Sequence, residues 1–391
     1  MSITPTDFLP FSRPSIDDDM IAEVIDTLKS GWLTTGPKVD RFERMFGDYV
    51  GSENVVAVNS GTAALHIAIQ LLGLENGDEV ITPSMTWPSA VNMIELTGGV
   101  PVFVDCDPGT LNISVEDVEK RITKKTRAII PVHFAGQPVD IDALIDVVKG
   151  WGIKIIEDAA HAAGALYKGD HVGTKADFTA YSFHPNKNIT TGEGGMLTIK
   201  NGDEIDLARK IKFHGVDKRG WKRFGKDLKT LEYEVVVPGY KYNMMDIQAA
   251  LGIHQLGRLD EFINKRELLA RYYDQALSNI PHIAPLGAVS YSHRHARHLY
   301  ILKLNLEQIR ITRDEFMREL KKRNIGSGLH YTAVHKHKYY SDKYGPFLDA
   351  LPSTEHCSER IISVPLFPAM TTSDQDRVVS AIDSILGECS C

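Results

Sequence analysis

The sequence lacks the features that mark membrane proteins and secreted, disulfide-bonded proteins. Only four cysteines occur among 391 residues, and two of them, Cys389 and Cys391, lie in the last three positions. This spacing provides no disulfide framework, so we expect reduced thiols. No segment approaches the roughly 18 consecutive apolar residues of a membrane-spanning helix, and no basic start precedes an apolar segment as in a secretory signal. We therefore expect a cytoplasmic protein that does not enter a membrane.

Long runs of basic residues are missing as well. The formal net charge is −7, and the composition is that of an ordinary globular protein. Nucleic-acid-binding proteins concentrate positive charge in long basic runs or on one face, and no long run of this kind occurs here. We therefore expect small molecules, and not nucleic acids, as the partners.

Strand-like and helical segments alternate through the first 250 or so residues, which is typical of an α/β fold with a mostly parallel sheet. The expected strands are Val55–Val58, Glu79–Thr82, Val102–Asp105, Ala128–Val132, Lys154–Glu157 and Phe178–Phe183. Between the first two, the apolar residues of TAALHIAIQLLG recur at helical spacing. A proline-free helical pattern from Gln255 to Leu277 then leads out of this region. We expect a large domain at 1–255 and a smaller C-terminal domain at 256–391.

The second domain carries its own element signals. The alternating segment HLYILKL at 298–304 predicts a strand. Thr312, followed three residues later by Glu315, forms a capping box that predicts the start of a helix. The last helix is expected to begin near Thr372.

The motif NSGTAAL at 59–65 predicts a close turn followed by a helix. Gly61 allows a close backbone approach, and Ser60 or Thr62 starts the helix. The free N–H groups and the positive dipole end of such a helix suit a phosphate. The simpler interpretation is an ordinary helix cap. Neither a Walker lysine motif nor G-x-G-x-x-G accompanies it, which argues against a nucleoside triphosphatase and a dinucleotide-binding fold.

The segment KIIEDAAHA at 154–162 is typical of a strand buried on both faces, with acidic residues at its carboxyl end. Open parallel sheets bind ligands at that edge, so Asp158 is a candidate site residue. The alternative is a helix cap for the alanine-rich segment that follows. His161 is expected to share a helical face with Asp158, where it orients the carboxylate or contacts substrate. The alternative for His161 is a structural role.

Lys187 follows another strand and precedes a glycine-rich turn in YSFHPNKNITTGEGGM, so it is expected at the same sheet edge as Asp158. A phosphate cradle, a buried acid and a lysine together match the needs of pyridoxal phosphate. The lysine forms a Schiff base, and the acid keeps the pyridine nitrogen protonated. Ser182 can add a hydroxyl to the phosphate site. Trp87 is a candidate to stack on the cofactor ring, with a place in the core as the alternative.

Six ordered motifs are distributed along the chain between residues 30 and 371: SGWLTTGPKV at 30–39, SGTAAL at 60–65, EDAAHA at 157–162, SFHPNKNITTGEGG at 182–195, PGYKYNMMDIQAA at 238–250 and PLFPAMT at 365–371. With them the sequence resembles the DegT-type nucleotide-sugar aminotransferases. The resemblance implies a fold-type I pyridoxal-phosphate transferase like aspartate aminotransferase, with helices on both faces of the sheet and a smaller C-terminal α+β domain.

The resemblance also implies roles for individual residues. Lys187 and Asp158 are the implied catalytic residues. Further implied cofactor contacts are Gly61, Thr62, Trp87, His161, Ser182 and Asn243. In this family the active site lies at a homodimer interface, so Asn243 is expected to reach the phosphate of the partner subunit's cofactor. Some relatives with histidine at the lysine position are dehydratases, and the lysine found here favours transamination.

Segments 8–14, 325–340 and 358–371 resemble family members that make UDP-4-amino-4-deoxy-L-arabinose. The resemblance implies that L-glutamate gives its amine to the cofactor, leaving 2-oxoglutarate. C4 of a UDP-linked 4-keto-pentose then receives the amine in a ping-pong reaction. Thr35 and His330 are implied substrate contacts. Alternatives are another nucleotide-linked 4-keto-6-deoxyhexose, a 3-keto sugar, or a non-catalytic pyridoxal-phosphate-binding regulator. Such a regulator carries an added DNA-binding module, for which no room is visible.

Two segments rich in cationic side chains remain. The basic segment 216–229 contains Arg219 and Arg223, which are candidates to pair with a nucleotide diphosphate; an ordinary solvated loop is the alternative. The histidine-rich segment HRHARH at 293–298 is weak evidence for metal, and pyridoxal chemistry needs none. We expect no metal site.

Overall fold

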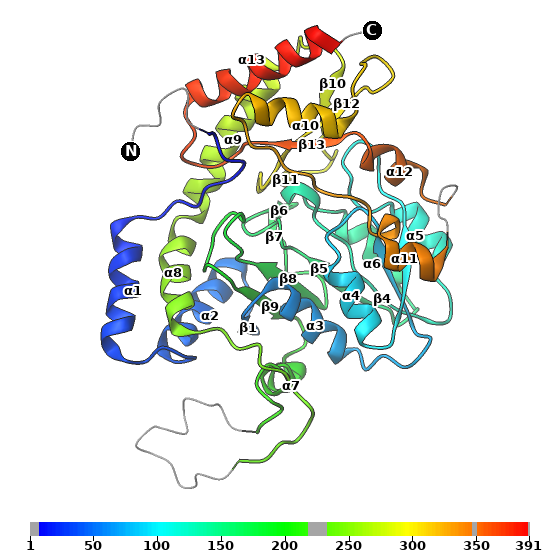
Figure 1. Ribbon diagram of the computed structural model, residues 1–391. Helices are drawn as coiled ribbons and strands as arrows, with labels where there is room; N and C mark the ends of the chain where they lie inside the picture. Colours follow the sequence, from blue (N-terminus) through cyan, green and yellow to red (C-terminus); the bar gives the residue numbers. More distant parts are fainter. Residues whose placement is uncertain (1–7, 218–232, 346–349, 390–391) are drawn as a thin grey trace.

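A seven-stranded sheet forms the centre of the protein in the computed structural model, which describes residues 8–217, 233–345 and 350–389 (Figure 1). The strand order is β1-β9-β8-β5-β4-β2-β3, and only β9 runs antiparallel to its neighbours. The strands are β1 (Val55–Val58), β2 (Glu79–Pro83), β3 (Val100–Val104), β4 (Thr126–Ile129), β5 (Lys154–Asp158), β8 (Phe178–Ser182) and β9 (Gly195–Ile199). This confirms the expected α/β fold with a mostly parallel sheet.

Helices cover both faces of this sheet because its strands bury side chains on both sides. Val55 and Ala57 pack in a cluster with α2 and α8, whereas Val56 and Val58 pack in a cluster with α3. A strand alternates its side chains between two faces, so both helical layers are needed to bury β1. The helices of this region are α1 (Asp18–Ser30), α2 (Pro37–Val50), α3 (Gly61–Leu71), α4 (Ser89–Leu96), α5 (Val115–Arg121), α6 (Ile141–Val148), α7 (Ile205–Ile211) and α8 (Asp246–Gly257).

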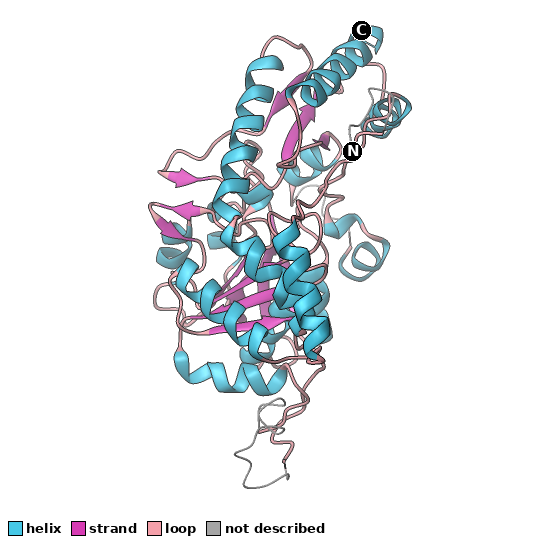
Figure 2. Cartoon of the chain, turned by 90° about the vertical axis from the view of Figure 1, so that its left-hand side faces the viewer, coloured by secondary structure: helices cyan, strands magenta, loops and turns pink. Residues whose placement is uncertain are grey.

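The C-terminal part has a separate antiparallel sheet in the order β10-β12-β13. Leu302, Phe316 and Ile382 belong to its own apolar core. Figure 2 shows this smaller sheet and the seven-stranded sheet one above the other. The elements are α9 (Leu259–Ala276), β10 (Ile283–Pro285), β12 (Tyr300–Leu304), α10 (Arg313–Lys322), α11 (Lys338–Tyr344), α12 (Pro352–Ser358), β13 (Ile361–Val364) and α13 (Thr372–Cys389). A third sheet joins β6 (Leu166–Tyr167), β7 (Asp170–His171) and β11 (His293–Arg294).

The expected continuous helix from 255 to 277 is wrong. Helix α8 ends at Gly257, and α9 begins at Leu259, with Arg258 in a non-helical conformation between them. Glycine weakens a helix because it loses the most backbone freedom on folding, so the chain turns where Gly257 occurs. The expected domain boundary at 255/256 falls inside α8 and stays a prediction. Among the helices that the structure describes, none has the length and apolarity needed to cross a bilayer.

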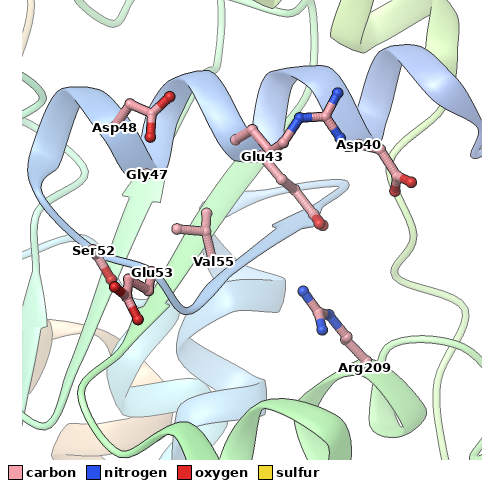
Figure 3. Close-up of a pocket in the computed structure, with 9 residues that line it drawn as sticks. Asp40, Glu43, Gly47, Asp48, Ser52, Glu53, Val55 and Arg209 are labelled. Atoms are coloured by element: carbon pink, nitrogen blue, oxygen red, sulfur yellow. The ribbon is translucent and has the colours of Figure 1, made fainter.

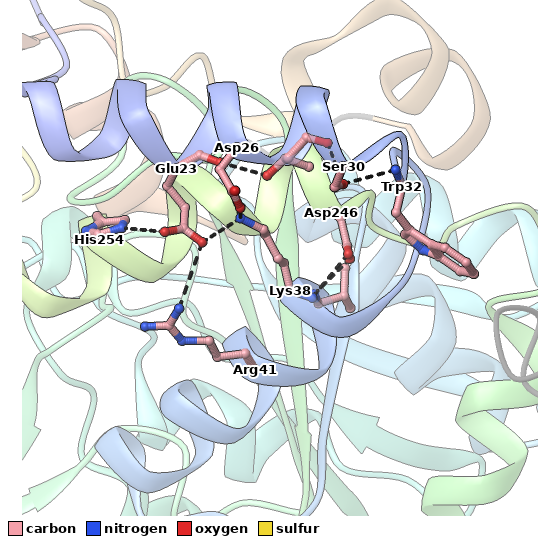
Figure 4. A network of polar contacts seen from close by, with 10 residues as sticks. Glu23, Asp26, Ser30, Trp32, Lys38, Arg41, Asp246 and His254 are labelled. Atoms are coloured by element: carbon pink, nitrogen blue, oxygen red, sulfur yellow. Dashed lines mark hydrogen bonds and ion pairs between the residues drawn. The ribbon is translucent and has the colours of Figure 1, made fainter. Parts of the chain in front are cut away.

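Asp246 joins two motifs that lie 200 residues apart. Helix α2 has no capping side chain of its own at its N-terminus. The Asp246 carboxylate accepts hydrogen bonds from the backbone N–H groups of Gly36 (2.8 Å), Val39 (3.0 Å) and Lys38 (3.1 Å). Figure 4 shows the contact between Lys38 and Asp246 beside an ion pair of 2.6 Å between Lys38 Nζ and Glu23 Oε1. A carboxylate on free helical N–H groups is stabilising, so Asp246 fixes the 30–39 motif against α8.

Candidate active site

The carboxyl ends of three strands bring the candidate residues to one sheet edge. Asp158 ends β5, and it pairs in register with Ala180 of the parallel strand β8. Ser182 ends β8, two residues further along. Strand β1 ends nearby and is followed by Ser60, which caps α3. Ligands of open parallel sheets bind at this edge, so the fold places Asp158 and Ser182 where a site is expected.

Lys187 lies in a tight loop between β8 and β9. Its backbone N–H donates to the carbonyl of His184 at 2.9 Å, and Phe183 N–H donates to the carbonyl of Gly194 at 2.9 Å, closing the loop. A side chain at position 194 would place its Cβ only 2.1 Å from Thr191 Oγ1. Glycine is therefore required there, which explains the glycine-rich turn after the lysine.

Lys187 and Asp158 act on one another electrostatically. Burial lowers the pKa of the Lys187 ammonium to about 8, against the opposing charge of Asp158. Burial raises the pKa of the Asp158 carboxyl, while the backbone N–H of Ala160 and the Lys187 charge oppose that rise. A half-buried lysine with a lowered pKa has a larger neutral fraction near neutral pH and is a better nucleophile and base.

The lowered pKa of Lys187 predicts a pH dependence of stability in the cofactor-free protein. Between pH 8 and 10.5 the unfolded lysine stays protonated while the folded one does not, so stability rises with pH across this window. The shift from 10.5 to about 8 corresponds to at most about 3 kcal/mol. Urea unfolding of wild type and Lys187→Met at several pH values measures it. The difference in the free energy of unfolding between the two proteins isolates the contribution of Lys187. If this difference did not change between pH 8 and 10.5, the lowered pKa of Lys187 would be contradicted.

The N-terminus of α3 has the geometry of a phosphate cradle. The Ser60 hydroxyl caps the helix by accepting from the N–H of Ala63 at 3.1 Å. A Cβ on Gly61 would lie 2.8 Å from the Ser182 Cβ, so only glycine lets the first turn approach Ser182 this closely. Thr62 Oγ1 lies 2.9 Å from Ser89 Oγ. The N-terminus of α3 therefore lies against Ser182, and its free N–H groups are compatible with the phosphate of pyridoxal phosphate.

His161 and Asp158 do not share a helix, so that expectation is wrong. Residues 159–165 form successive turns, in which the N–H of Ala162 donates to the carbonyl of Ala159 at 2.9 Å. The buried ring of His161 instead has its Nε2 2.7 Å from the hydroxyl of Tyr331, and its Nδ1 has no partner among the described residues. The helix-cap alternative for Asp158 is also wrong, because no helix follows it and its Oδ1 accepts from Ala160 N–H within the turn.

Trp87 and His330 lie on the side of the site formed with the C-terminal part. Trp87 is 61% exposed, so the alternative that placed it in the core is wrong. Its ring lies 5.9 Å from the ring of Tyr331. His330 Nδ1 lies 2.8 Å from Ser363 Oγ. Burial and the Lys187 charge lower the pKa of His330 to about 3, so it is neutral.

Asn243 and Thr35 contact one another within this chain. The Asn243 side-chain amide donates to Thr35 Oγ1 at 2.7 Å, and that hydroxyl donates to the carbonyl of Met244 at 2.6 Å. Asn243 also bridges Val58, the last residue of β1, so this pair lies at the sheet edge. Arg219 and Arg223, expected to pair with a diphosphate, lie outside the described residues.

The histidine-rich segment packs against the site. Its first residues form β11, which pairs with β6, and His298 lies with its ring 4.4 Å from that of His161. Within residues 8–217, 233–345 and 350–389, no group of three or more His, Cys, Asp or Glu side chains is arranged to hold a metal ion.

A separate cavity of about 320 Å³ lies near the opposite end of β1, beside its first residue Val55. Figure 3 shows side chains of α2 facing Arg209 of α7 across it. Its lining includes Asp40, Glu43, Asp48 and Glu53 with Arg44 and Arg209. Carboxylates outnumber arginines, so it does not suit a phosphate ester, and it contains none of the candidate residues.

Sequence reasoning missed two residue groups near the site. Tyr331 contacts His161 although the two are 170 positions apart. Behind Asp158, the buried carboxylate of Glu157 accepts from Thr179 Oγ1 at 2.9 Å and lies 3.2 Å from His133 Nε2. The HY pair in GLHYTAVH and the adjacent acids in IIED were the only local signals.

Comparison with known proteins agrees with this geometry. The DegT/DnrJ/EryC1/StrS aminotransferase family model matches residues 14–383. A Streptococcus pneumoniae structure named as the sugar aminotransferase Spr1654, in its pyridoxal-phosphate form, has 34% identity and a TM-score of 0.89 and covers 97% of this chain and 99% of its own. The aminotransferase TlmJ from Streptoalloteichus hindustanus has 30% identity, a TM-score of 0.89 and the same coverages.

Helicobacter pylori PseC, described as an aminotransferase involved in the biosynthesis of pseudoaminic acid, has 25% identity and a TM-score of 0.88. It covers 98% of this chain and 100% of its own. The matches span almost the whole chain, and Asp158, the Lys187 loop and the N-terminus of α3 follow strands that end at one sheet edge. The chain therefore belongs to the DegT/DnrJ/EryC1/StrS aminotransferase family of pyridoxal-phosphate-dependent sugar aminotransferases.

Proposed function

We propose that this protein transfers the amine of L-glutamate to C4 of a UDP-linked 4-keto sugar, with a 4-keto-pentose as the preferred acceptor. The observation that carries the proposal is that Asp158 ends β5 and Lys187 follows the adjacent parallel strand β8, so that both lie at the carboxyl edge of the sheet and their charges act on one another. Both substrates are soluble and charged, and we propose a cytoplasmic location for the reaction.

Each residue of the site has a proposed task. Pyridoxal phosphate, when bound, supplies a carbonyl that reacts with amines and a ring that withdraws electrons from the reacting carbon. Lys187 would hold the cofactor through its amine and would move the proton of the reacting carbon, a role that its lowered pKa favours. Asp158 holds the proton of the pyridine nitrogen. Gly61, Thr62 and Ser182 hold the phosphate, while Trp87 covers the ring.

The sugar assignment rests on the segments around His330. His330 is a neutral group within reach of the Lys187 charge, and we propose that its ring contacts a hydroxyl of the sugar. The similar Streptococcus pneumoniae structure is named as a sugar aminotransferase, which supports a sugar acceptor. The likeness of 325–340 and 358–371 to arabinose-forming relatives favours the pentose. Thr35, Arg219 and Arg223 are proposed contacts of the nucleotide sugar.

The acceptor specificity is expected to favour the pentose. A pocket shaped for a pentose rejects the exocyclic C6 carbon of a hexose by steric clash, whereas a hexose pocket loses only about 1–3 kcal/mol per missing carbon. We expect kcat/KM for the UDP-4-keto-pentose to exceed that of 4-keto-6-deoxyhexoses on UDP and on dTDP by more than about tenfold, or 1.4 kcal/mol. Mass spectrometry of the products with glutamate as donor measures it. A tenfold preference for a hexose would refute the pentose as the preferred acceptor, while the assignment of the protein as an aminotransferase would stand.

We further propose a homodimer with shared active sites, in which Asn243 reaches the partner's cofactor. Mixing inactive Lys187→Ala with inactive Asn243→Ala chains should then restore about a quarter of wild-type activity. Random exchange makes half of the dimers hybrid and repairs one of two sites in each. The matched control mixes Lys187→Ala with Asp158→Asn, two lesions of the same chain's site, and should restore nothing. No recovery in the first mixture, once chain exchange is confirmed, would refute shared sites.

A further inference from the structure

Three buried aromatic side chains, Tyr331, His161 and His298, lie together within reach of the Lys187 charge, and the proposed mechanism gives none of them a task. Tyr331, His161 and His298 are 7%, 4% and 2% exposed. The Tyr331 hydroxyl lies 2.7 Å from His161 Nε2, and the two rings are nearly parallel at 25°. His298 packs its ring 4.4 Å from that of His161. The three side chains come from segments far apart in the sequence.

The protonation states of His161 and Tyr331 limit where the ring proton of His161 can lie. His161 is neutral, because burial and the Lys187 charge lower its pKa well below the ordinary value. Tyr331 keeps its hydroxyl proton, because burial and the nearby Asp158 charge raise its pKa. A neutral imidazole has one N–H donor and one acceptor nitrogen.

Two arrangements of the protons are possible. If Tyr331 donates to His161 Nε2, the Nδ1–H of His161 is the one hydrogen of this pair left without a partner among the described residues. If Nε2–H donates to Tyr331 instead, both the tyrosine proton and the bare Nδ1 lack partners there. Both ring nitrogens of His298 lack partners among the described residues in either arrangement. Unsatisfied polar atoms in a protein interior are costly, so the first arrangement is the more stable one.

We propose that Tyr331 is a positioning residue that fixes His161 as the Nδ1–H tautomer and so turns it into a hydrogen-bond donor for an oxygen atom of the bound cofactor. The inference deepens the proposed function, because it assigns a task to a residue that does not itself react. A buried donor without a protein acceptor is what a site for an oxygen-bearing ligand requires. His298 packs against His161 and limits the rotation of its ring.

The tautomer is directly measurable in the wild-type protein. Histidine labelled with ¹⁵N gives long-range ¹H–¹⁵N spectra that distinguish protonated from bare ring nitrogens, and a His161→Gln variant assigns the signal. We expect His161 to carry its proton on Nδ1 with and without pyridoxal phosphate. A proton on Nε2 would overturn the proposal, and this result needs no variant of Tyr331 to fold.

The Tyr331→Phe variant tests the consequence for cofactor binding. It keeps the ring and its packing against Trp87 but removes the hydroxyl. We expect the Nδ1–H preference to be lost and the Kd for pyridoxal phosphate, titrated into the cofactor-free protein, to rise about 3- to 10-fold, as for one hydrogen bond. The control is Tyr300→Phe, which removes a hydroxyl bonded to Asp274 Oδ1 at 2.7 Å in the C-terminal sheet. It should change neither quantity.

The outcomes separate this inference from the proposed function. An unchanged tautomer or an unchanged Kd in Tyr331→Phe would overturn the role of Tyr331. Wild-type protein that binds pyridoxal phosphate with the Nδ1–H tautomer, yet aminates no keto sugar, would reject the proposed reaction and leave the role of Tyr331 supported.

Discussion

Replacing Lys187 by arginine is expected to lower turnover by at least about 10²–10⁴-fold, which is the usual contribution of a positioned acid or base. Arginine keeps the positive charge and nearly the length of the side chain. Its guanidinium stays protonated in proteins, so it can act neither as a nucleophile nor as a base. Rapid-mixing spectra of the half-reaction with L-glutamate measure the loss directly.

The control for this variant is Lys200→Arg. Lys200 is an exposed lysine that follows β9, and its Nζ donates to the carbonyl of Lys175 at 2.9 Å. It should keep nearly wild-type rates, which shows that the exchange of lysine for arginine is harmless elsewhere. A Lys187→Arg protein with rates close to wild type would show that another group performs the proton transfer.

Replacing Asp158 by asparagine is expected to lower turnover by roughly 10²–10³-fold while the cofactor stays bound, as for the loss of one preorganised electrostatic contact. The amide has the shape of the carboxylate but not its charge, so it cannot hold the proton of the pyridine nitrogen. Both half-reactions should slow, because both need the electron-withdrawing ring. Single-turnover rates in each direction check this.

Glu157→Gln is the matched control for Asp158→Asn. Glu157 is the adjacent residue of β5, and its side chain extends to the other face, toward Thr179 and His133. The Glu157→Gln substitution should lower the free energy of unfolding, because it weakens a buried polar network. It should leave turnover within a few-fold of wild type. Equal losses of turnover in the two variants would contradict a specific task for Asp158.

The sequence predicted six of the seven strands of the large sheet, because these strands are apolar runs between turn residues; β9 (Gly195–Ile199) was not predicted. Strand β1 was predicted with correct bounds, and Thr312 and Thr372 begin helices as expected. Strand β4 was placed two residues late and extended too far, through Ile130 to Val132. Pro131 has no N–H to donate to the ladder, so regular pairing stops before it.

The candidate site was only partly predictable. Alternation and the turn after each strand place Asp158 and Lys187 at one edge, since parallel strands share their carboxyl ends. No local pattern predicts that Tyr331 meets His161 or that Asp246 caps α2, because these contacts depend on tertiary packing. The exposure of Trp87 could not be predicted for the same reason, since the sequence does not reveal which neighbours cover a side chain.

The measurement that tests the central claim most directly is reductive trapping of the cofactor. Purified protein loaded with pyridoxal phosphate is treated with borohydride, digested and mapped by mass spectrometry. The predicted result is a single phosphopyridoxyl group on Lys187, the half-buried lysine whose pKa is lowered to about 8 beside Asp158. A stoichiometric label on any other lysine, with Lys187 unmodified, would contradict the assignment of this site.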